Sequence, residues 1–248
     1  MVAVNRQRST VQRAKDFATF PIRAFLMFGG RDRFGLSALA TERFEYVTRE
    51  VDGYCLDIGC GRHNRLVTEF LGGEGVGIDL YPYEGLDERH LVEDMTNLPF
   101  SDGSFDAVTF NANFNHIPEP LRDREVAEAY RCLRPGGRVI VTMGNPVAEV
   151  LVHKVQALYD RALGTNFDVD SERGMEEGEA YYVLDREIRR RLAQAGFGGA
   201  RKRRFTSQWG LNHLIVARKP TEPGGREVAP RPLGEDRPGT RLGPGSDT

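Results

Sequence analysis

Two glycines directly after a short apolar run are the residues of this sequence best suited to approach a ligand. The run and the glycines lie within Tyr54-Cys55-Leu56-Asp57-Ile58-Gly59-Cys60-Gly61-Arg62. Because glycine has no Cβ atom, the backbone at Gly59 and Gly61 can contact a nucleoside at the carboxyl edge of a sheet. About 20 residues further on, Asp79 ends a second apolar run, where its carboxylate can accept hydrogen bonds from ribose hydroxyls. The spacing therefore predicts a nucleoside-binding turn.

The segments that position these residues alternate between short β-branched runs and helical patterns. Such alternation is typical of βαβ units around a parallel sheet. We expect strands at Tyr54–Ile58, Gly75–Ile78, Ala107–Phe110 and Arg138–Met143, and a closing antiparallel hairpin from Arg201–Ser207 and Leu211–Arg218. A helix that ends at Gly196 is predicted from apolar residues at helical spacing, namely Leu184, Ile188, Leu192 and Ala195.

Three further segments flank or interrupt this pattern. Residues 1–50 are expected to form a helical extension that closes over the site, with an inner face made of Leu36, Leu39, Phe44 and Val47. The main domain is expected over residues 51–219, with a helical insertion at about 146–182. We expect this insertion to be a substrate cap. Two alternative roles stay open for it: a contact in a homodimer, or plain packing of its helix on the sheet. Residues 220–248 are rich in Pro and Gly and are predicted to be disordered.

Composition excludes several classes of protein. The 34 Lys and Arg residues and 36 Asp and Glu residues give a net charge of −2, so no global field recruits nucleic acid. The three cysteines lie in no metal-ligand spacing, which favours reduced thiols. The apolar stretch Phe17–Phe28 is interrupted by Arg23, and no segment reaches the length of a membrane span. We expect a cytoplasmic protein without a membrane span or a bound metal.

The motifs of residues 53–143 resemble those of the class I S-adenosylmethionine-dependent methyltransferases, in particular the small-molecule group with a Leu-Asp-Ile-Gly-Cys-Gly strand. Besides that strand, the resemblance rests on Glu93–Phe100, Phe105–Phe110, Asn111–Pro118 and Leu133–Arg138. It implies an α/β fold with a Rossmann-like, doubly wound, mostly parallel seven-stranded sheet and a C-terminal antiparallel hairpin. It also implies S-adenosyl-L-methionine as the cofactor.

The resemblance assigns roles to individual residues. It implies that Asp94 binds the adenine amino group, that Met95 packs on the ring, and that Asp57 orients the amino end of the cofactor. The expected cofactor-binding residues are Asp57, Gly59, Cys60, Gly61, Asp79, Leu80, Asp94, Met95 and Asn111. The family often has a third glycine where His63 stands here, and we expect His63 to begin the next helix rather than touch the methionine end. Asn64 replaces the last glycine of the Gly-x-Gly-x-x-Gly fingerprint, which argues against a nicotinamide cofactor.

Methyl transfer from a sulfonium is an in-line displacement in which positioning can contribute about 7–11 kcal/mol, so a catalytic base is optional. His116 is the first candidate for such a base. The family favours the alternative that this histidine orders its loop. We expect transfer to a small-molecule acceptor. An RNA or protein methyltransferase stays open because of basic residues within 186–191 and 201–204, as does a regulatory module that binds the cofactor without transferring its methyl group.

Overall fold

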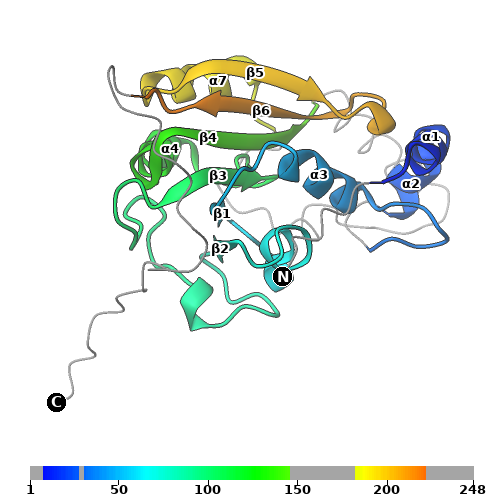
Figure 1. Cartoon of the computed structure of the whole chain (residues 1–248), viewed down its shortest axis with the longest axis horizontal. Helices are drawn as coiled ribbons and strands as arrows, with labels where there is room; N and C mark the ends of the chain where they lie inside the picture. The colour runs from blue at the N-terminus through cyan, green and yellow to red at the C-terminus, as the bar shows by residue number, and fades with distance from the viewer. Residues whose placement is uncertain (1–7, 28–30, 146–181, 222–248) are drawn as a thin grey trace, which may run out of the picture.

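Six strands form one mixed sheet at the centre of the molecule (Figure 1). The computed structural model describes residues 8–27, 31–145 and 182–221. Within these ranges the strand order is β2-β1-β3-β4-β6-β5. The strands are β1 (Cys55–Ile58), β2 (Gly75–Ile78), β3 (Phe105–Asn111), β4 (Leu133–Gly144), β5 (Gly198–Arg204) and β6 (Asn212–Arg218). Strands β1 to β4 are parallel, and β6 is antiparallel to both β4 and β5. This architecture confirms the predicted Rossmann-like fold.

The prediction of seven strands was wrong for the described residues, which form six. Beyond β2, where a further edge strand would lie, the chain makes a single parallel bridge between Asp79 and Leu91. Two hydrogen bonds hold it, from Asp79 N–H to the His90 carbonyl at 2.8 Å and from Val92 N–H to the Asp79 carbonyl at 3.1 Å. A 3-10 turn, η3 (Glu88–His90), precedes the bridge and an Asp94 turn follows it, so the extended segment is too short for a strand.

Helices cover both faces of the sheet, which makes the fold doubly wound. On one face, α4 (Glu119–Cys132) and α7 (Asp185–Gln194) contribute Val126, Ala129, Ile188 and Leu192 to the larger core. On the other face, α3 (Leu39–Thr48) and a π-helical turn, η2 (Leu66–Phe70), contribute Tyr46, Val47, Leu66 and Phe70 to the second core. Alternate residues of β6 enter opposite cores, as expected for a strand buried on both faces.

Strands β4 and β5 differ most from the bounds expected for them. Strand β4 begins at Leu133, because the turn expected before it is already paired with Phe105 of β3. Strand β5 ends at Arg204 rather than Ser207, since the next residues form a 3-10 turn, η4 (Thr206–Gln208). This turn is bound to α3, where Gln208 Nε2 donates to the Leu39 carbonyl at 3.1 Å. The tight three-residue hairpin turn that we expected is therefore replaced by a longer connection.

An N-terminal pair of helices, α1 (Thr10–Ala18) and α2 (Phe20–Leu26), precedes α3. A group of charged side chains joins these three helices, and we call it the N-terminal ion network: Arg8, Asp16, Arg23, Glu42 and Glu45. Of the expected inner face, Leu39 and Val47 are buried and Phe44 is half-buried. Leu36 lies before α3, in a bridge with Arg33.

Two expectations fall on segments outside the described residues. These are the insertion at about 146–182, of which Tyr182 alone is described, and the tail from residue 222 onward. Among the helices that are described, none has the length and apolar character needed to cross a lipid bilayer.

Candidate cofactor site

The turn after β1 adopts a conformation that favours glycine. Gly59 has a φ of 69° and Gly61 a φ of 63°, in the left-handed region that side chains with a Cβ atom rarely adopt. The turn crosses the end of β2, where Gly59 N–H and Cys60 N–H donate to the Ile78 carbonyl at 2.8 and 3.0 Å. Around Gly61, no atom of the other described residues, its two chain neighbours aside, lies within 4 Å of the place that a Cβ atom would take. The turn therefore leaves open space beside exposed backbone.

Asp79 follows β2 and faces this turn. One carboxylate oxygen accepts the Gly61 N–H at 2.9 Å, and the other accepts the Tyr81 N–H at 3.2 Å. The residue is 6% exposed. A carboxylate has about four acceptor positions, so these two bonds leave capacity for ribose hydroxyls. The structure thus places Asp79 beside Gly61 in the way that the sequence spacing predicted.

Asp57 lies inside the sheet beneath the glycine turn. It is 1% exposed, and one carboxylate oxygen accepts a hydrogen bond from the Thr109 hydroxyl of β3 at 2.5 Å. Burial raises the pKa of Asp57 to about 7; the Thr109 bond lowers it and the nearby Asp79 charge raises it further. Asp57 is therefore a titratable group near neutral pH. Thr109 was not among the predicted site residues, because a threonine inside an apolar strand carries no local signal of function.

The departure from the family pattern at residues 63 and 64 has a structural counterpart. His63 has a φ of 64° and lies in a 3-10 turn, η1 (Arg62–Asn64). Its backbone N–H donates to the Glu84 carbonyl at 2.8 Å. Asn64 packs against Gly77 of β2, where an added Cβ atom would overlap the Asn64 side chain. The glycine that permits close packing of turn and strand is thus found on β2.

The end of β3 meets the glycine turn from the other side. Asn111 points its side-chain oxygen to the Thr142 hydroxyl of β4, which donates to it at 3.0 Å. Asn113 Nδ2 donates to the Ile58 carbonyl at 3.3 Å and lies over Gly59, where a Cβ atom would overlap it. Asn113 is therefore the asparagine of this loop that contacts the predicted cofactor turn, although the sequence prediction had selected Asn111.

Asp94 and Met95 lie near the β2 edge of the sheet. Asp94 is exposed and accepts the backbone and hydroxyl hydrogens of Thr96, both at 2.7 Å, which lowers the pKa of Asp94. Met95 is buried in the larger core. Glu125 of α4 is buried, and one of its oxygens has no hydrogen-bond partner among the described residues. Burial and the charge of Asp94 raise the pKa of Glu125 to about 7.

The remaining predicted residues occupy different positions around the turn. The Cys60 thiol is half-buried, and burial together with the charges of Asp57 and Asp79 raises its pKa. Leu80 is exposed directly after Asp79. His116 is half-buried in the loop after β3, where its backbone N–H donates to the Asn113 carbonyl at 2.8 Å. His116 thus lies in the loop whose Asn113 contacts the glycine turn.

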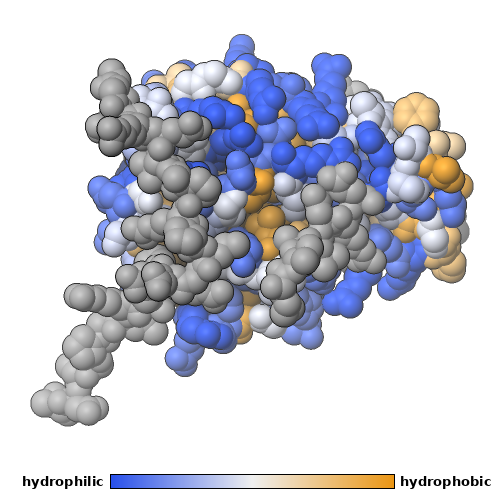
Figure 2. Space-filling model, viewed as in Figure 1, coloured by the Kyte–Doolittle hydropathy of each residue, from blue (hydrophilic) through white to orange (hydrophobic). Residues whose placement is uncertain are grey.

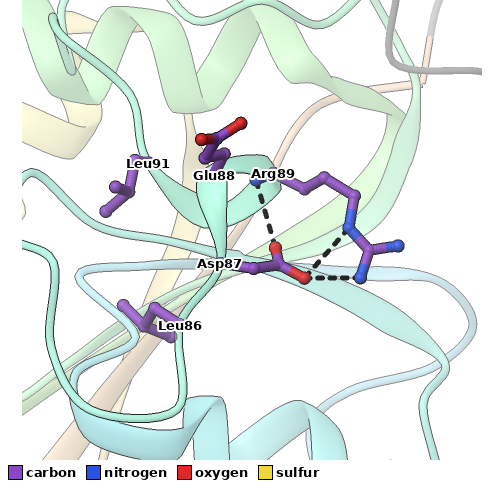
Figure 3. Close-up of a pocket in the computed structure, with 5 residues that line it drawn as sticks. All are labelled: Leu86, Asp87, Glu88, Arg89 and Leu91. Carbon is purple, nitrogen blue, oxygen red and sulfur yellow. Dashed lines mark hydrogen bonds and ion pairs between the residues drawn. The ribbon is translucent and has the colours of Figure 1, made fainter.

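A shallow hollow lies next to the site but does not contain its predicted residues. It is lined by Leu86, Asp87, Glu88, Arg89 and Leu91 (Figure 3). Asp87 and Arg89 pair across it at 2.5 Å, and this pairing lowers the pKa of Asp87 to about 2. Leu91 also forms the bridge to Asp79, so the hollow adjoins the end of β2. Because Arg89 already compensates the Asp87 charge, we assign this hollow no role in binding the cofactor.

The residues present fit S-adenosylmethionine. Gly61 leaves open space for a nucleoside, Asp79 offers acceptors beside it, and Asp57 adds a buried carboxyl beneath the same turn. A cationic sulfonium cofactor suits a site whose two carboxyls form no ion pair with any described residue. Within the described ranges, no three or more His, Cys, Asp or Glu side chains are grouped to hold a metal ion.

Comparison with known proteins agrees with this fit. Residues 56–141 match the sequence model of a family described as "Methyltransferase domain". A demethylmenaquinone methyltransferase of Clavibacter sepedonicus is 30% identical over 150 residues, covering 56% of this chain and 56% of that protein. The ubiquinone/menaquinone biosynthesis C-methyltransferase UbiE of Dinoroseobacter shibae is 36% identical over 122 residues, covering 46% of this chain and 44% of that one. The chain thus spans about half the length of the curated relatives it matches.

A solved structure extends the comparison to the fold. The S-adenosylmethionine-dependent methyltransferase of Thermotoga maritima described as a possible histamine N-methyltransferase has a TM-score of 0.52 and 17% identity. That match covers 83% of this chain and 95% of the other, and it supports the fold alone. The sheet and the glycine turn define a Rossmann-like domain of the class I type. Residues 56–141 thus carry the sequence pattern of the family described as "Methyltransferase domain".

Proposed function

We propose that this protein transfers the methyl group of S-adenosylmethionine to a small molecule with a quinone-like ring. The observation that carries the proposal is the pairing of the Gly59–Gly61 turn with Asp79 at the ends of β1 and β2. The acceptor class comes from the relatives, whose names describe methyltransferases of menaquinone and ubiquinone biosynthesis. A cytoplasmic location is part of the proposal, in keeping with three free cysteines.

The residues around the turn would have different roles in binding the cofactor and in transferring the methyl group. The open space at Gly61 would admit the nucleoside part and the Asp79 carboxylate would accept from its hydroxyls, with Leu80 beside it, and Asp94 and Met95 would hold the adenine. Asp57, Cys60 and Asn113 shape the turn from below and from the β3 side. The bound cofactor supplies a methyl group on an activated sulfonium. His116 would accept a proton from the acceptor or order its loop, and positioning of the two reactants supplies the largest part of the rate enhancement.

Four of the eight basic residues that motivated an RNA acceptor form ion pairs within the protein. Arg191 pairs with Asp123 and Glu187, at 2.7 and 3.0 Å. Three residues of β5 are paired in the same way, Arg201 and Arg203 with Glu50 and Lys202 with Asp185. Side chains held in such pairs are less available to phosphates. We therefore favour a small-molecule acceptor.

Calorimetric titration with S-adenosylhomocysteine tests the cofactor assignment. The Asp79→Asn variant keeps an oxygen for the Gly61 N–H but loses the charge, so we expect binding to weaken 10-fold to 100-fold. Asp87→Asn is the matched control, since it removes a carboxylate from the same segment without touching the turn. Equal binding by both variants, or stronger binding of NADH by the wild type, would refute the assignment.

Turnover tests the acceptor. Purified protein is incubated with S-adenosylmethionine and a demethylated quinone with a short side chain, and the S-adenosylhomocysteine formed is quantified. We expect product that depends on both reactants and disappears with Asp79→Asn at low cofactor concentration. Tight cofactor binding without product from quinones or other aromatic acceptors would instead support a regulatory module.

A further inference from the structure

The two N-terminal helices bury two charged side chains and expose three apolar ones. Asp16 of α1 and Arg23 of α2 are 0% exposed, whereas Val11 is 79%, Phe17 52% and Ile22 56% exposed. This distribution is the reverse of a helix that packs an apolar stripe on a core. The N-terminal ion network holds Asp16 and Arg23 on the inner side of α1 and α2, whereas Val11, Phe17 and Ile22 lie at the surface.

Two residues from other segments extend this surface. Trp209, which follows η4, is 52% exposed; its ring centroid lies 6.2 Å from that of Phe17, and its Nε1–H donates to the Phe17 carbonyl at 2.9 Å. Phe34 is 88% exposed, and Lys15 Nζ ties its turn to α1 through the Gly35 carbonyl at 2.8 Å. We define the apolar patch as Val11, Phe17, Ile22, Phe34 and Trp209. Figure 2 shows apolar residues gathered at this end of the molecule.

The charge around the apolar patch selects the kind of surface it can meet. Residues 8–36 contain six basic residues and two acidic ones, so their net charge is 6 − 2 = +4, while the whole chain has −2. Asp16 and Arg23 are buried and the Arg8 side chain is 7% exposed, so four of the six basic residues remain available at the surface. Lys15, Arg31 and Arg33 are exposed. A second copy of this chain would bring the same positive charge against the patch, whereas an anionic surface would complement it.

We propose that the apolar patch inserts into the headgroup region of an anionic phospholipid bilayer. Its five apolar side chains would lie at the boundary with the acyl chains, and Lys15, Arg31 and Arg33 would lie among the phosphates. Interfacial binding of this kind combines large exposed apolar residues with exposed basic ones on short helices. The N-terminal ion network holds α1 and α2 in place, so the patch is formed before lipid is met.

Trp209 provides a direct readout, because it is the only tryptophan in the chain. The intact protein is mixed with vesicles of phosphatidylcholine containing phosphatidylglycerol, and with vesicles of phosphatidylcholine alone. We expect a blue shift of tryptophan emission and co-sedimentation with the anionic vesicles. Binding to phosphatidylcholine alone is expected to be at least 10-fold weaker. Equal binding to both vesicles, or no emission shift with either, would overturn the proposal.

Variants separate the apolar and the electrostatic contributions. Replacing Ile22 and Phe34 together by Asp should weaken vesicle binding at least 10-fold, and each of Arg31→Gln and Arg33→Gln should weaken it about 5-fold. Leu184→Asp is the control, because it also replaces an exposed apolar residue by Asp but lies at the N-cap of α7, where Asp is favoured. Unchanged binding by the Ile22 and Phe34 variant would overturn the proposal. So would a concentration-dependent dimer that this variant abolishes, since the patch would then bind a second copy.

Discussion

Buried carboxyls occur in two regions of this molecule, and they are balanced in different ways. Asp16 of the N-terminal ion network accepts hydrogen bonds from Arg8 at 2.7 Å and from the Ser37 N–H at 3.1 Å. Asp57, under the glycine turn, accepts one from a neutral hydroxyl at 2.5 Å. Both residues are almost fully buried, at 0% and 1% exposed. The same side chain at the same depth is therefore compensated by cations in one region and by neutral groups in the other.

The pKa values of these two aspartates move in opposite directions. Burial alone would raise the pKa of Asp16, but hydrogen bonds from Ser37 and Arg8 and the charge of Arg23 hold it below the ordinary value. For Asp57, burial prevails and the pKa rises to about 7. A carboxyl whose partners are all internal has a structural role. One that lacks a cationic partner within the described residues is suited to a ligand that brings positive charge.

The largest effect should come from removing a cation of the N-terminal ion network. Arg23 is 0% exposed and donates to Glu42 at 2.6 Å and to the Ser37 carbonyl at 2.7 Å. In Arg23→Met, the free energy of unfolding measured with urea should fall by about 3–5 kcal/mol, because buried carboxylates lose their partner. Arg13→Met, on the half-buried side of α1, is the control and should change it by less than about 0.5 kcal/mol. A similar fall in the free energy of unfolding for both variants would show that the ion network is not needed to balance its buried carboxylates.

Asp57 should make stability depend on pH in the opposite sense to Asp16. Its folded pKa of about 7 lies above the unfolded value near 4, so the native state holds the extra proton between these values. Stability should therefore fall as pH rises from 4 to 7, and Asp57→Asn should abolish about 2–4 kcal/mol of that fall. Urea titrations across this range measure it. If the free energy of unfolding changed with pH in the same way for the wild type and for Asp57→Asn, the raised pKa of Asp57 would be contradicted.

Glu125 should give the smallest effect, with the opposite sign to Arg23. One of its oxygens is buried without a partner, and its pKa is about 7. Glu125→Met should therefore raise the free energy of unfolding at pH 8 by about 1–2 kcal/mol, and by less at pH 5, where the carboxyl is protonated. Glu128→Met on the same helix is the control and should destabilise, because Glu128 accepts from Leu98 N–H and binds Arg131. Loss of stability in both variants would show that Glu125 is internally satisfied.

Local patterns in the sequence predicted the centre of the fold well. The apolar runs at β1 and β2 and the glycines after β1 are each specified by a few adjacent residues, and the structure places them as expected. The seventh strand was not predicted correctly, because its single bridge to Asp79 depends on turns on either side of Leu91. The end of β5 depends on contacts of η4 with α3, more than 160 residues earlier in the chain.

The site was harder to predict where it depends on contacts between strands. Asn111 accepts a hydrogen bond from Thr142 of β4, whereas Asn113 donates to the Ile58 carbonyl beside the glycine turn, and the cofactor contact expected of Asn111 stays a prediction. Nothing in the spacing of the loop distinguishes the two. The inverted faces of α1 and α2 were also missed, because an apolar residue in a helical pattern is ordinarily assigned to the core. The burial of Arg23 depends on its pairing with Glu42, and Glu42 in turn accepts a hydrogen bond from Ser207, far away in the sequence.

The contacts between the N-terminal helices and η4 also determine when the protein can finish folding. Ser207 binds Glu42 across 165 residues, and Trp209 binds the Phe17 carbonyl across 192. Contacts of such long sequence separation form late, since the intervening chain must first be closed into a loop. During synthesis, α1 and α2 leave the ribosome well before residues 206–209 and cannot dock on this segment until it has followed. These two helices are therefore made long before they can reach their native positions.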